Sequence, residues 1–331
     1  MKQTKILPII KNTKIWLTFS LILIVISLGS WAIRGLNFGI DFVGGTIVTI
    51  DLHTEFKTSD VRKITDKYDK KADITYAGDT KQEVVISTKE SLSTEQRTAL
   101  FKSFKDQYKL KDSDLISVDT VTASVGQETA RNTVIAATVA VLLMLVYVSF
   151  RFEFYFGLSA VIALVHDILI VIGVYALFQI QVNSPFIAAI LTILGYSIND
   201  TIVVFDRIRE NEKEMGMKDL RLLVDTSITQ TMRRSINTVA TTLIAIIALY
   251  IFAVDAIRDF ALPLIVGIAC GCYSSIFVAS PLWVIFQKKF SNSGFNVKMK
   301  KHDRFWINRD WRRPIRLPGN VSCLMLFQKL S

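Results

Sequence analysis

The sequence predicts a polytopic α-helical membrane protein with six transmembrane helices and one small α+β domain outside the membrane. Hydrophobic residues make up 51% of the 331 residues and charged residues only 21%, below the roughly 25% usual for a soluble domain. The mean hydropathy is +0.38, and the apolar residues gather in six long segments. A polar stretch between the first two segments carries short strand and helix patterns.

Each of the six segments is long enough to predict a spanning helix, because ~20 residues at ~1.5 Å each cross a ~30 Å hydrocarbon core. The first could be a secretory signal, but its apolar core exceeds the roughly 7–15 residues of such signals, and no small-residue cleavage site precedes Arg34. We therefore expect an uncleaved anchor. The segments are Ile15–Ile33, Thr133–Phe150, Phe154–Phe178, Pro185–Phe205, Ser235–Val254 and Phe260–Phe286.

Lysine and arginine in the loops predict the orientation, because positive residues stay on the cytoplasmic side. The N-terminus holds four Lys and no acid, residues 206–234 hold seven Lys/Arg, and the tail after Phe286 holds eleven. We therefore expect both termini in the cytoplasm. The expected parts are an N-terminus at 1–14, the first helix at 15–33, a periplasmic domain at 34–131, helices 2–6 at 132–286 and a basic tail at 287–331.

The net charge of +10 is thus mostly a topology signal. A nucleic-acid partner is not expected, since the basic tail has no aromatic or groove-reading pattern. Membrane lipids are the expected surroundings.

Residues 35–130 show the order β-α-β-β-α-β of a ferredoxin-like split βαβ unit. Ser59 is expected to cap a helix that runs to about Lys70, and Ser93-Thr94-Glu95-Gln96 fits a capping box that opens a helix to about Lys109. Gly78-Asp79 predicts a turn. No catalytic constellation is present, so binding or mechanical work is expected. The predicted strands are Thr46–Asp51, Ala72–Ala77, Glu83–Thr88 and Leu115–Thr122.

Ionisable residues inside the spans are functional candidates, because a charge near the bilayer centre costs at least about 2.5–3.5 kcal/mol. His166 and Asp167 lie in the third segment, and Asn199 and Asp200 in the fourth. Asp200 lies ~22 Å along its helix at ~1.5 Å per residue. If the fourth and fifth helices are antiparallel neighbours, Arg234 reaches the same depth.

For Asp200 and Arg234 we predict a proton-titrated carboxylate whose pairing changes with protonation, and a static ion pair is the alternative. The pair His166-Asp167 has a second interpretation as a buried polar contact that holds helices together. The Asp206-Arg207 pair marks the cytoplasmic end of the fourth segment, where a solvated interfacial face is the alternative.

Small residues recur at every fourth position of the sixth segment, at Gly267, Gly271 and Ser275, which predicts close helix packing. Gly44 and Gly45 follow Asp41 just after the first segment and predict a backbone turn. The three Cys residues indicate no disulfide and no metal site. Nucleotide-loop, metalloprotease and hydrolase motifs are absent from the sequence. We therefore expect no cofactor and no enzyme, which leaves the ion gradient as the energy source, ~2.3 kcal/mol per charge at 100 mV.

Five strings, spread in order over residues 15–290, resemble the SecD/SecF family of bacterial protein-export membrane proteins, which belongs to the RND superfamily. The fourth-segment string, GYSINDTIVVFDRIREN, is long enough to be highly specific. The strings are Phe38–Thr46, Ala163–Asp167, Gly195–Asn211, Asp259–Leu264 and Gly271–Ala279.

The resemblance implies an RND-type half with six spans and a ferredoxin-like periplasmic domain in the bacterial inner membrane. In this family SecF pairs with SecD. The pair assists SecYEG, often with YajC, in proton-driven late translocation of preproteins, while SecA supplies the ATP-driven part. Motif matching places the family's proton-transporting Asp and Arg on Asp200 and Arg234. Some relatives use sodium, and an aspartate serves either ion.

Two other functions stay open. An RND-type exporter half for small molecules or lipids would need a larger external domain than this chain has. A passive translocon scaffold would need neither Asp200 nor Arg234. The tail Trp306–Ser331 departs from the family pattern, and we assign it no function.

Overall fold

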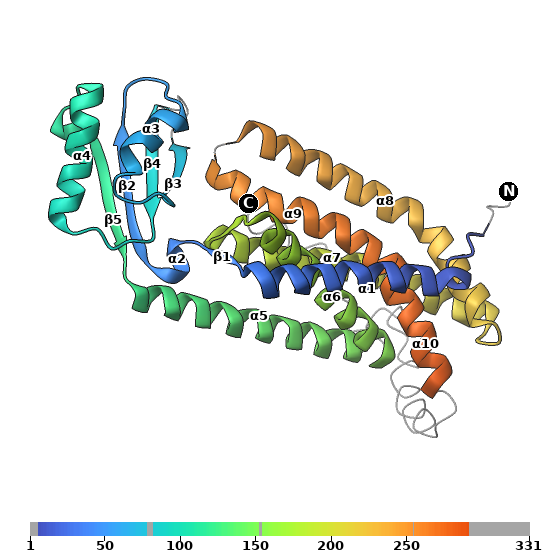
Figure 1. Ribbon diagram of the computed structural model, residues 1–331. Helices are drawn as coiled ribbons and strands as arrows, with labels where there is room; N and C mark the ends of the chain where they lie inside the picture. The colour runs from blue at the N-terminus through green and yellow to red at the C-terminus, as the bar shows by residue number, and fades with distance from the viewer. Residues whose placement is uncertain (1–5, 78–81, 152–153, 254, 291–331) are drawn as a thin grey trace, which may run out of the picture. The chain divides into compact units, whose positions relative to one another are not determined.

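The computed structural model describes residues 6–77, 82–151, 154–253 and 255–290. Within these ranges six helices are long and apolar enough to cross a membrane (Figure 1), which confirms the six predicted spans. The tail Trp306–Ser331, whose sequence does not match the family pattern, lies outside the described residues. The spans are α1 (Thr13–Arg34), α5 (Ala123–Arg151), α6 (Phe154–Phe178), α7 (Ser184–Met215), α8 (Leu220–Phe252) and the consecutive α9 (Asp255–Ser274), η3 (Ser275–Ala279) and α10 (Ser280–Phe290).

Three of these helices extend beyond their apolar segments. α5 and α8 begin well before the segments predicted at Thr133 and Ser235, and α7 runs past Phe205. Gly216, with φ of +70°, ends α7 in a conformation that favours glycine. The Asp219 side chain then accepts hydrogen bonds from two backbone N–H groups in the first turn of α8. Many of the polar residues that follow or precede the apolar segments in the sequence therefore lie in extensions of these helices and not in loops.

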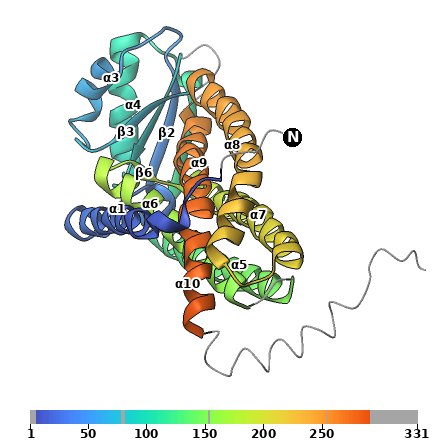
Figure 2. The same ribbon diagram turned by 90° about the vertical axis from the view of Figure 1, so that its right-hand side faces the viewer.

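The helices α6, α7 and α9 form the centre of the bundle. In the most apolar windows of α6 and α7, 44% and 50% of the residues are buried, against 11%, 6% and 11% in α1, α5 and α8. Figures 1 and 2 show α7, α8 and α9 side by side. Apolar side chains such as Tyr175, Ile193 and Ile268 make one core across α6, α7 and α9. The outer helices keep apolar faces uncovered, as a lipid-facing helix requires.

The α+β domain contains a four-stranded antiparallel sheet in the order β3-β4-β2-β5. This confirms the predicted β-α-β-β-α-β order. Val48 and Ile50 of β2 are buried, whereas Ile47 and Thr49, which alternate with them, are only partly buried, because successive side chains point to opposite faces. The elements are β2 (Gly45–Asp51), α3 (Thr58–Thr65), β3 (Asp73–Ala77), β4 (Glu83–Thr88), α4 (Thr94–Tyr108), η2 (Asp112–Asp114) and β5 (Leu115–Val121).

The N-termini of α3 and α4 can be compared with the two predicted helix caps. Ser93 accepts a hydrogen bond from the Gln96 backbone N–H while the Gln96 side chain accepts one from the Ser93 N–H, which confirms the capping box. The cap predicted at Ser59 is wrong, since α3 begins at Thr58 with Lys57 in the cap position. α3 also ends at Thr65 instead of Lys70. The predicted turn Gly78-Asp79 lies outside the described residues.

A short linker joins α1 to the α+β domain and pairs with the loop between α6 and α7. It comprises β1 (Asn37–Phe38) and α2 (Ile40–Val43), and β1 pairs in parallel with β6 (Gln181–Val182). The Gly39 N–H adds a hydrogen bond of 2.7 Å to the Val182 carbonyl. At the other end of α1, the 3₁₀ turn η1 (Ile10–Asn12) binds α8 through the Ile10 N–H and the Asp225 carboxylate, 2.8 Å apart.

Candidate functional site

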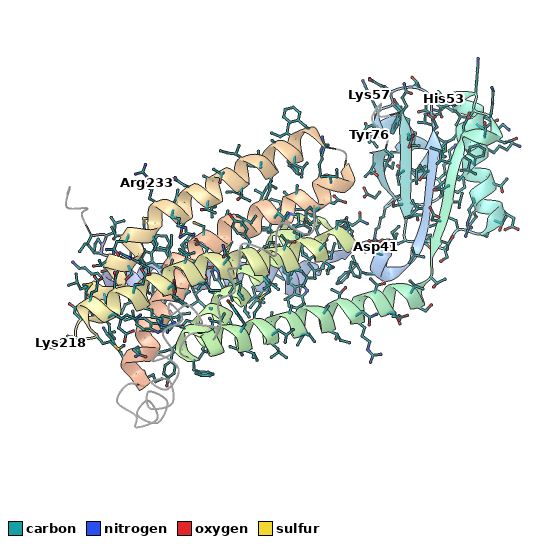
Figure 3. The ribbon with its side chains drawn as sticks, turned by 180° about the vertical axis from the view of Figure 1, so that it is seen from behind. Asp41, His53, Lys57, Tyr76, Lys218 and Arg233 are labelled. Carbon is teal, nitrogen blue, oxygen red and sulfur yellow. The ribbon has the colours of Figure 1, made fainter. Side chains whose placement is uncertain are left out.

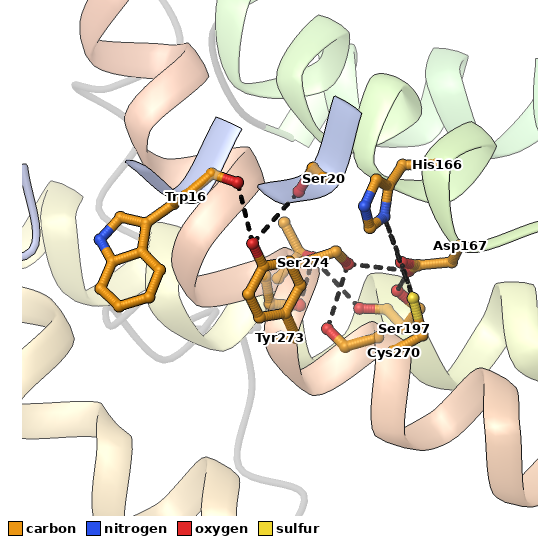
Figure 4. A network of polar contacts seen from close by, with 11 residues as sticks. Trp16, Ser20, His166, Asp167, Ser197, Cys270, Tyr273 and Ser274 are labelled. Carbon is orange, nitrogen blue, oxygen red and sulfur yellow. Dashed lines mark hydrogen bonds and ion pairs between the residues drawn. The ribbon is translucent and has the colours of Figure 1, made fainter. Parts of the chain in front are cut away.

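A polar cluster lies among the central helices, around the carboxylate of Asp167 (Figure 4). Asp167 Oδ2 accepts hydrogen bonds from the hydroxyls of Ser197 in α7, at 2.7 Å, and Ser274 in α9, at 2.8 Å. Asp167 Oδ1 lies 3.0 Å from His166 Nδ1 and 3.3 Å from Cys270 Sγ. His166 and Asp167 are both buried. The carboxylate therefore joins α6, α7 and α9 in the interior of the bundle.

Tyr273 extends this cluster to α1. Its hydroxyl donates a hydrogen bond of 3.0 Å to the Trp16 carbonyl and lies 3.2 Å from Ser20 Oγ (Figure 4). Its ring stacks near His166, with centroids 6.1 Å apart. The polar contacts of Asp167 thus join α6, α7 and α9, and Tyr273 connects α9 to α1 beside them.

A second buried carboxylate, Asp200, lies between α7, α8 and η3. Its polar neighbours are the hydroxyls of Ser235 and Ser275, and the Arg234 charge acts on it from α8. Its Oδ2 atom is buried and lacks a hydrogen-bond partner among the described residues. No ion pair joins Asp200 directly to Arg234 within the described part of the chain, where Arg234 is exposed. The structure thus brings the two predicted residues to neighbouring positions without a direct contact.

The predicted small-residue positions of α9 and η3 face α7. A Cβ atom on Gly267 would lie 2.3 Å from Ile193 Cδ1, and one on Gly271 would lie 3.0 Å from Ser197 Cβ. Ser275 Oγ lies 2.8 Å from Thr201 Oγ1. The contacting residues recur at every fourth position on both helices. The two helices therefore pack closely from Gly267 to Ser275, which lies beside Asp200.

The residues of the linker have structural contacts. Asp41 Oδ2 accepts a hydrogen bond of 2.7 Å from the Ser184 N–H, at the first turn of α7 (Figure 3), where the helix dipole favours a negative charge. Gly44 and Gly45 have φ of +84° and +150°. A Cβ on Gly45 would lie 2.1 Å from the Thr88 carbonyl oxygen. Only glycine fits this turn.

The other predicted residues lie apart from the clusters. Asn199 is exposed. Arg207 donates hydrogen bonds to Gln230 Oε1 in α8 and to Glu210 Oε2, at 2.6 and 2.7 Å, and Asp206 lies partly buried beside it. These contacts hold the polar ends of α7 and α8 together. Figure 3 shows Arg233, the neighbour of Arg234, on the outer side of α8.

Sequence reasoning missed the hydroxyl and thiol partners of the two carboxylates. Ser197 and Thr201 are four residues apart on α7, and Cys270 and Ser274 are four apart on α9. Residues four apart lie on the same face of a helix. Small polar residues at this spacing opposite a buried acid would have been a usable signal.

The arrangement offers two kinds of chemistry. Asp200 is a buried carboxylate with one oxygen that no group in the described ranges binds, and this oxygen can take up a proton or a cation. Within the described ranges, His166, Asp167 and Cys270 form a group whose ligand atoms lie close enough to hold a metal ion, all within 4.8 Å of one another. The π-helical turn η3 carries Ser275 beside Asp200, and such turns are frequent at functional sites.

Comparisons with known proteins agree with this architecture. A family profile described as protein export membrane protein SecD/SecF, C-terminal, matches residues 101–289, and one for the SecD/SecF GG motif matches residues 29–55. The chain is 39% identical to the protein translocase subunit SecF of Sebaldella termitidis, over 90% of this chain and 97% of that protein. It is 36% identical to the SecF subunit of Haemophilus influenzae, over 81% and 82%.

Fused and solved relatives are also similar. The chain is 38% identical to the SecDF subunit of Thermus thermophilus and spans 37% of its length. The crystal structure of Thermus SecDF, described as a translocon-associated membrane protein, aligns with a TM-score of 0.75 at 36% identity. That alignment covers 87% of this chain and 40% of the solved one.

Proposed function

Because the chain belongs to the SecD/SecF family of protein export membrane proteins, we propose that it couples the proton gradient to Sec-dependent export through Asp200 and Arg234. It is a multi-pass membrane protein that aids Sec-dependent protein export, a transport subunit without catalytic activity. The proposal adds the energy source and the residues that use it.

The observation that carries the proposal is the buried Oδ2 atom of Asp200, which has no hydrogen-bond partner among the residues that the structure describes. Buried polar atoms are nearly always hydrogen-bonded, and a carboxylate in a membrane interior is retained for function. A proton from the gradient would satisfy this oxygen and neutralise the charge. Arg234 is one residue before Ser235, a neighbour of Asp200, so its guanidinium stabilises the ionised form when the proton leaves.

The proposed location is the bacterial inner membrane, with both termini in the cytoplasm and the α+β domain in the periplasm. An even number of spans supports the same side for both ends of the bundle. The four Lys of the N-terminus and the seven Lys/Arg of residues 206–234 favour the cytoplasm for that side.

The proposed partners are SecD, the SecYEG channel, YajC and translocating preproteins. Association with SecD follows from relatives in which both halves form one SecDF chain. Within this chain the apolar faces of α5 and α8 are largely exposed, which supports a partner helix bundle or lipid beside them. An α+β domain of this small size favours mechanical contact with a preprotein over a substrate channel.

The test is preprotein translocation into proteoliposomes that hold SecYEG, SecD and this chain. We expect Asp200→Asn to abolish the stimulation by a proton gradient, because the amide cannot take up or release the proton. The variant should still insert and co-purify with SecD. Asp106→Asn, the same change at an exposed position of α4, is the matched control and should export normally. Normal gradient-dependent export by Asp200→Asn would falsify the coupling role.

A matched control also exists for a substitution of Arg234. Arg234→Gln should reduce gradient-dependent export, whereas Arg233→Gln, on the neighbouring exposed residue, should leave it unchanged. Full export with both Asp200 and Arg234 neutralised would instead indicate a passive scaffold. Export of a small molecule or lipid without any preprotein would indicate an exporter half.

A further inference from the structure

Three donor atoms of different chemistry converge in the bundle interior at a place that the proton-coupling proposal does not use. They are His166 Nδ1, Asp167 Oδ1 and Cys270 Sγ (Figure 4). The separations are 3.0 Å between nitrogen and oxygen, 3.3 Å between sulfur and oxygen, and 4.0 Å between sulfur and nitrogen. The two helices that supply them, α6 and α9, are in direct contact.

These separations suit a tetrahedral zinc ion. Zinc binds His nitrogen and carboxylate oxygen at about 2.0–2.2 Å and thiolate sulfur at about 2.3 Å. At tetrahedral angles those bonds place nitrogen and oxygen about 3.3 Å apart, and sulfur about 3.6 Å from either. The observed distances differ from these values by about half an ångström or less. Side-chain rotation alone can close such a gap.

The charge of the donor set also fits a divalent ion in a membrane. One carboxylate, one thiolate and one neutral imidazole balance Zn²⁺, so the occupied site has no net charge and can lie within a bilayer. Mixed nitrogen, oxygen and sulfur donors favour zinc over magnesium or calcium, which require oxygen. Zinc binding releases the thiol proton of Cys270 to solvent and involves no electron transfer.

The surroundings resemble the support that metal ligands receive. The hydroxyls of Ser197 and Ser274 hold Asp167 Oδ2, which directs Oδ1 toward the other two donors. Cys270 is partly exposed, so the described residues do not enclose the group completely.

From these observations we propose that His166, Asp167 and Cys270 form a zinc-binding site, with water or another donor in the fourth position. This departs from the sequence expectation of no metal site. The bound ion links α6 to α9 and so stiffens the centre of the bundle. The site is distinct from Asp200, and its test does not depend on export.

The experiment uses the purified full chain in detergent, stripped of metal and titrated with Co²⁺, a spectroscopic substitute for zinc. A thiolate–cobalt bond gives a near-ultraviolet charge-transfer band, and intense visible bands report four-coordination. Two matched proteins are compared: Cys272→Ser/Cys323→Ser, which keeps only Cys270, and Cys270→Ser/Cys323→Ser, which keeps only Cys272. Zn²⁺ is then added to displace the cobalt.

The protein that keeps only Cys270 should show both the charge-transfer band and the visible bands, and both should disappear when Zn²⁺ is added. The protein that keeps only Cys272 should show no charge-transfer band. Ser274→Ala in the first background should weaken binding about 10–100-fold, because it frees Asp167 to turn away. Zn²⁺ should also raise the Tm of the first protein and not that of the second. Absence of the band from the Cys270 protein, or equal bands in both, overturns the site.

Discussion

Asp167 and Asp200 are both buried in the bundle, yet their surroundings differ. Both oxygens of Asp167 have hydrogen-bond partners, whereas one oxygen of Asp200 has none among the described residues. A fully satisfied carboxylate stabilises one arrangement of helices. An unsatisfied one gains from binding a proton or ion. This difference favours Asp200 over Asp167 for the proposed energy coupling, and it is consistent with Asp167 organising the helices or holding the proposed metal ion.

Outside the membrane, Asp114 gives a pH prediction. The backbone N–H of Lys111, then the Ser113 hydroxyl and His53, lower the pKa of Asp114 from its usual 3.8. Folding therefore favours the ionised carboxylate. The ionised carboxylate stabilises the folded domain fully when the pH is above the pKa that Asp114 has in the unfolded chain. This stabilisation is lost as the pH falls through the lower pKa that Asp114 has in the folded domain.

We expect Asp114→Asn to remove this contribution, so that the α+β domain opens more readily at neutral pH and loses less stability on acidification. The measurement is the free energy of local opening at β5, from amide hydrogen exchange corrected for intrinsic rates at each pH. Asp106→Asn is the control. Identical acid profiles for Asp114→Asn and the unchanged protein would contradict the prediction.

At the scale of elements, the pair α7 and α9 determines the geometry of the site. Gly267, Gly271 and Ser275 lie opposite Ile193, Ser197 and Thr201. Without a hydrophobic driving force between helices in lipid, such close packing supplies much of the association energy. The same line of contacts places Ser197 at Asp167 and Ser275 at Asp200. A larger residue in this line would displace both carboxylates.

Gly267→Ala tests this packing. Its Cβ would lie 2.3 Å from Ile193 Cδ1, so we expect a loss of about 1–3 kcal/mol in the free energy of unfolding in mixed micelles. Gly29→Ala in α1 is the matched control, since outside its own helical turn no described atom lies within 4 Å of its Cβ position. Ile193→Ala should restore part of the loss in the Gly267→Ala background, because the two sites are coupled. Equal effects at Gly29 and Gly267 would refute the close approach.

At the scale of the whole molecule, the six spans leave α1, α5 and α8 with mostly exposed apolar faces. Lipid or partner helices must cover these faces in the membrane. The linker ties the α+β domain to the bundle by the Asp41 contact with α7 and by the pairing of β1 with β6. A movement of α7 at Asp200 therefore has a covalent and hydrogen-bonded route to the domain.

The orientation of the molecule is tested by labelling single cysteines in a variant that lacks Cys270, Cys272 and Cys323. We expect Lys218→Cys, in the loop between α7 and α8 (Figure 3), and Lys5→Cys to react only from the cytoplasmic side. Lys102→Cys, exposed on α4, should react only from the periplasmic side. Labelling of Lys102→Cys and Lys218→Cys from one side would contradict the topology.

The sequence by itself determined the spans and the order of the α+β domain, because apolar length and strand alternation are local properties. It also singled out Asp200, since an acid in an apolar segment is visible in one helix. The predicted Ser59 cap failed, since α3 already begins at Thr58 and the extended Lys57 before it makes no side-chain cap hydrogen bond. The groups that surround each carboxylate could be identified only from the tertiary structure, because they depend on how the helices pack. Ser197 comes from α7, whereas Cys270 and Ser274 come from α9, and only helix packing brings these two groups to Asp167.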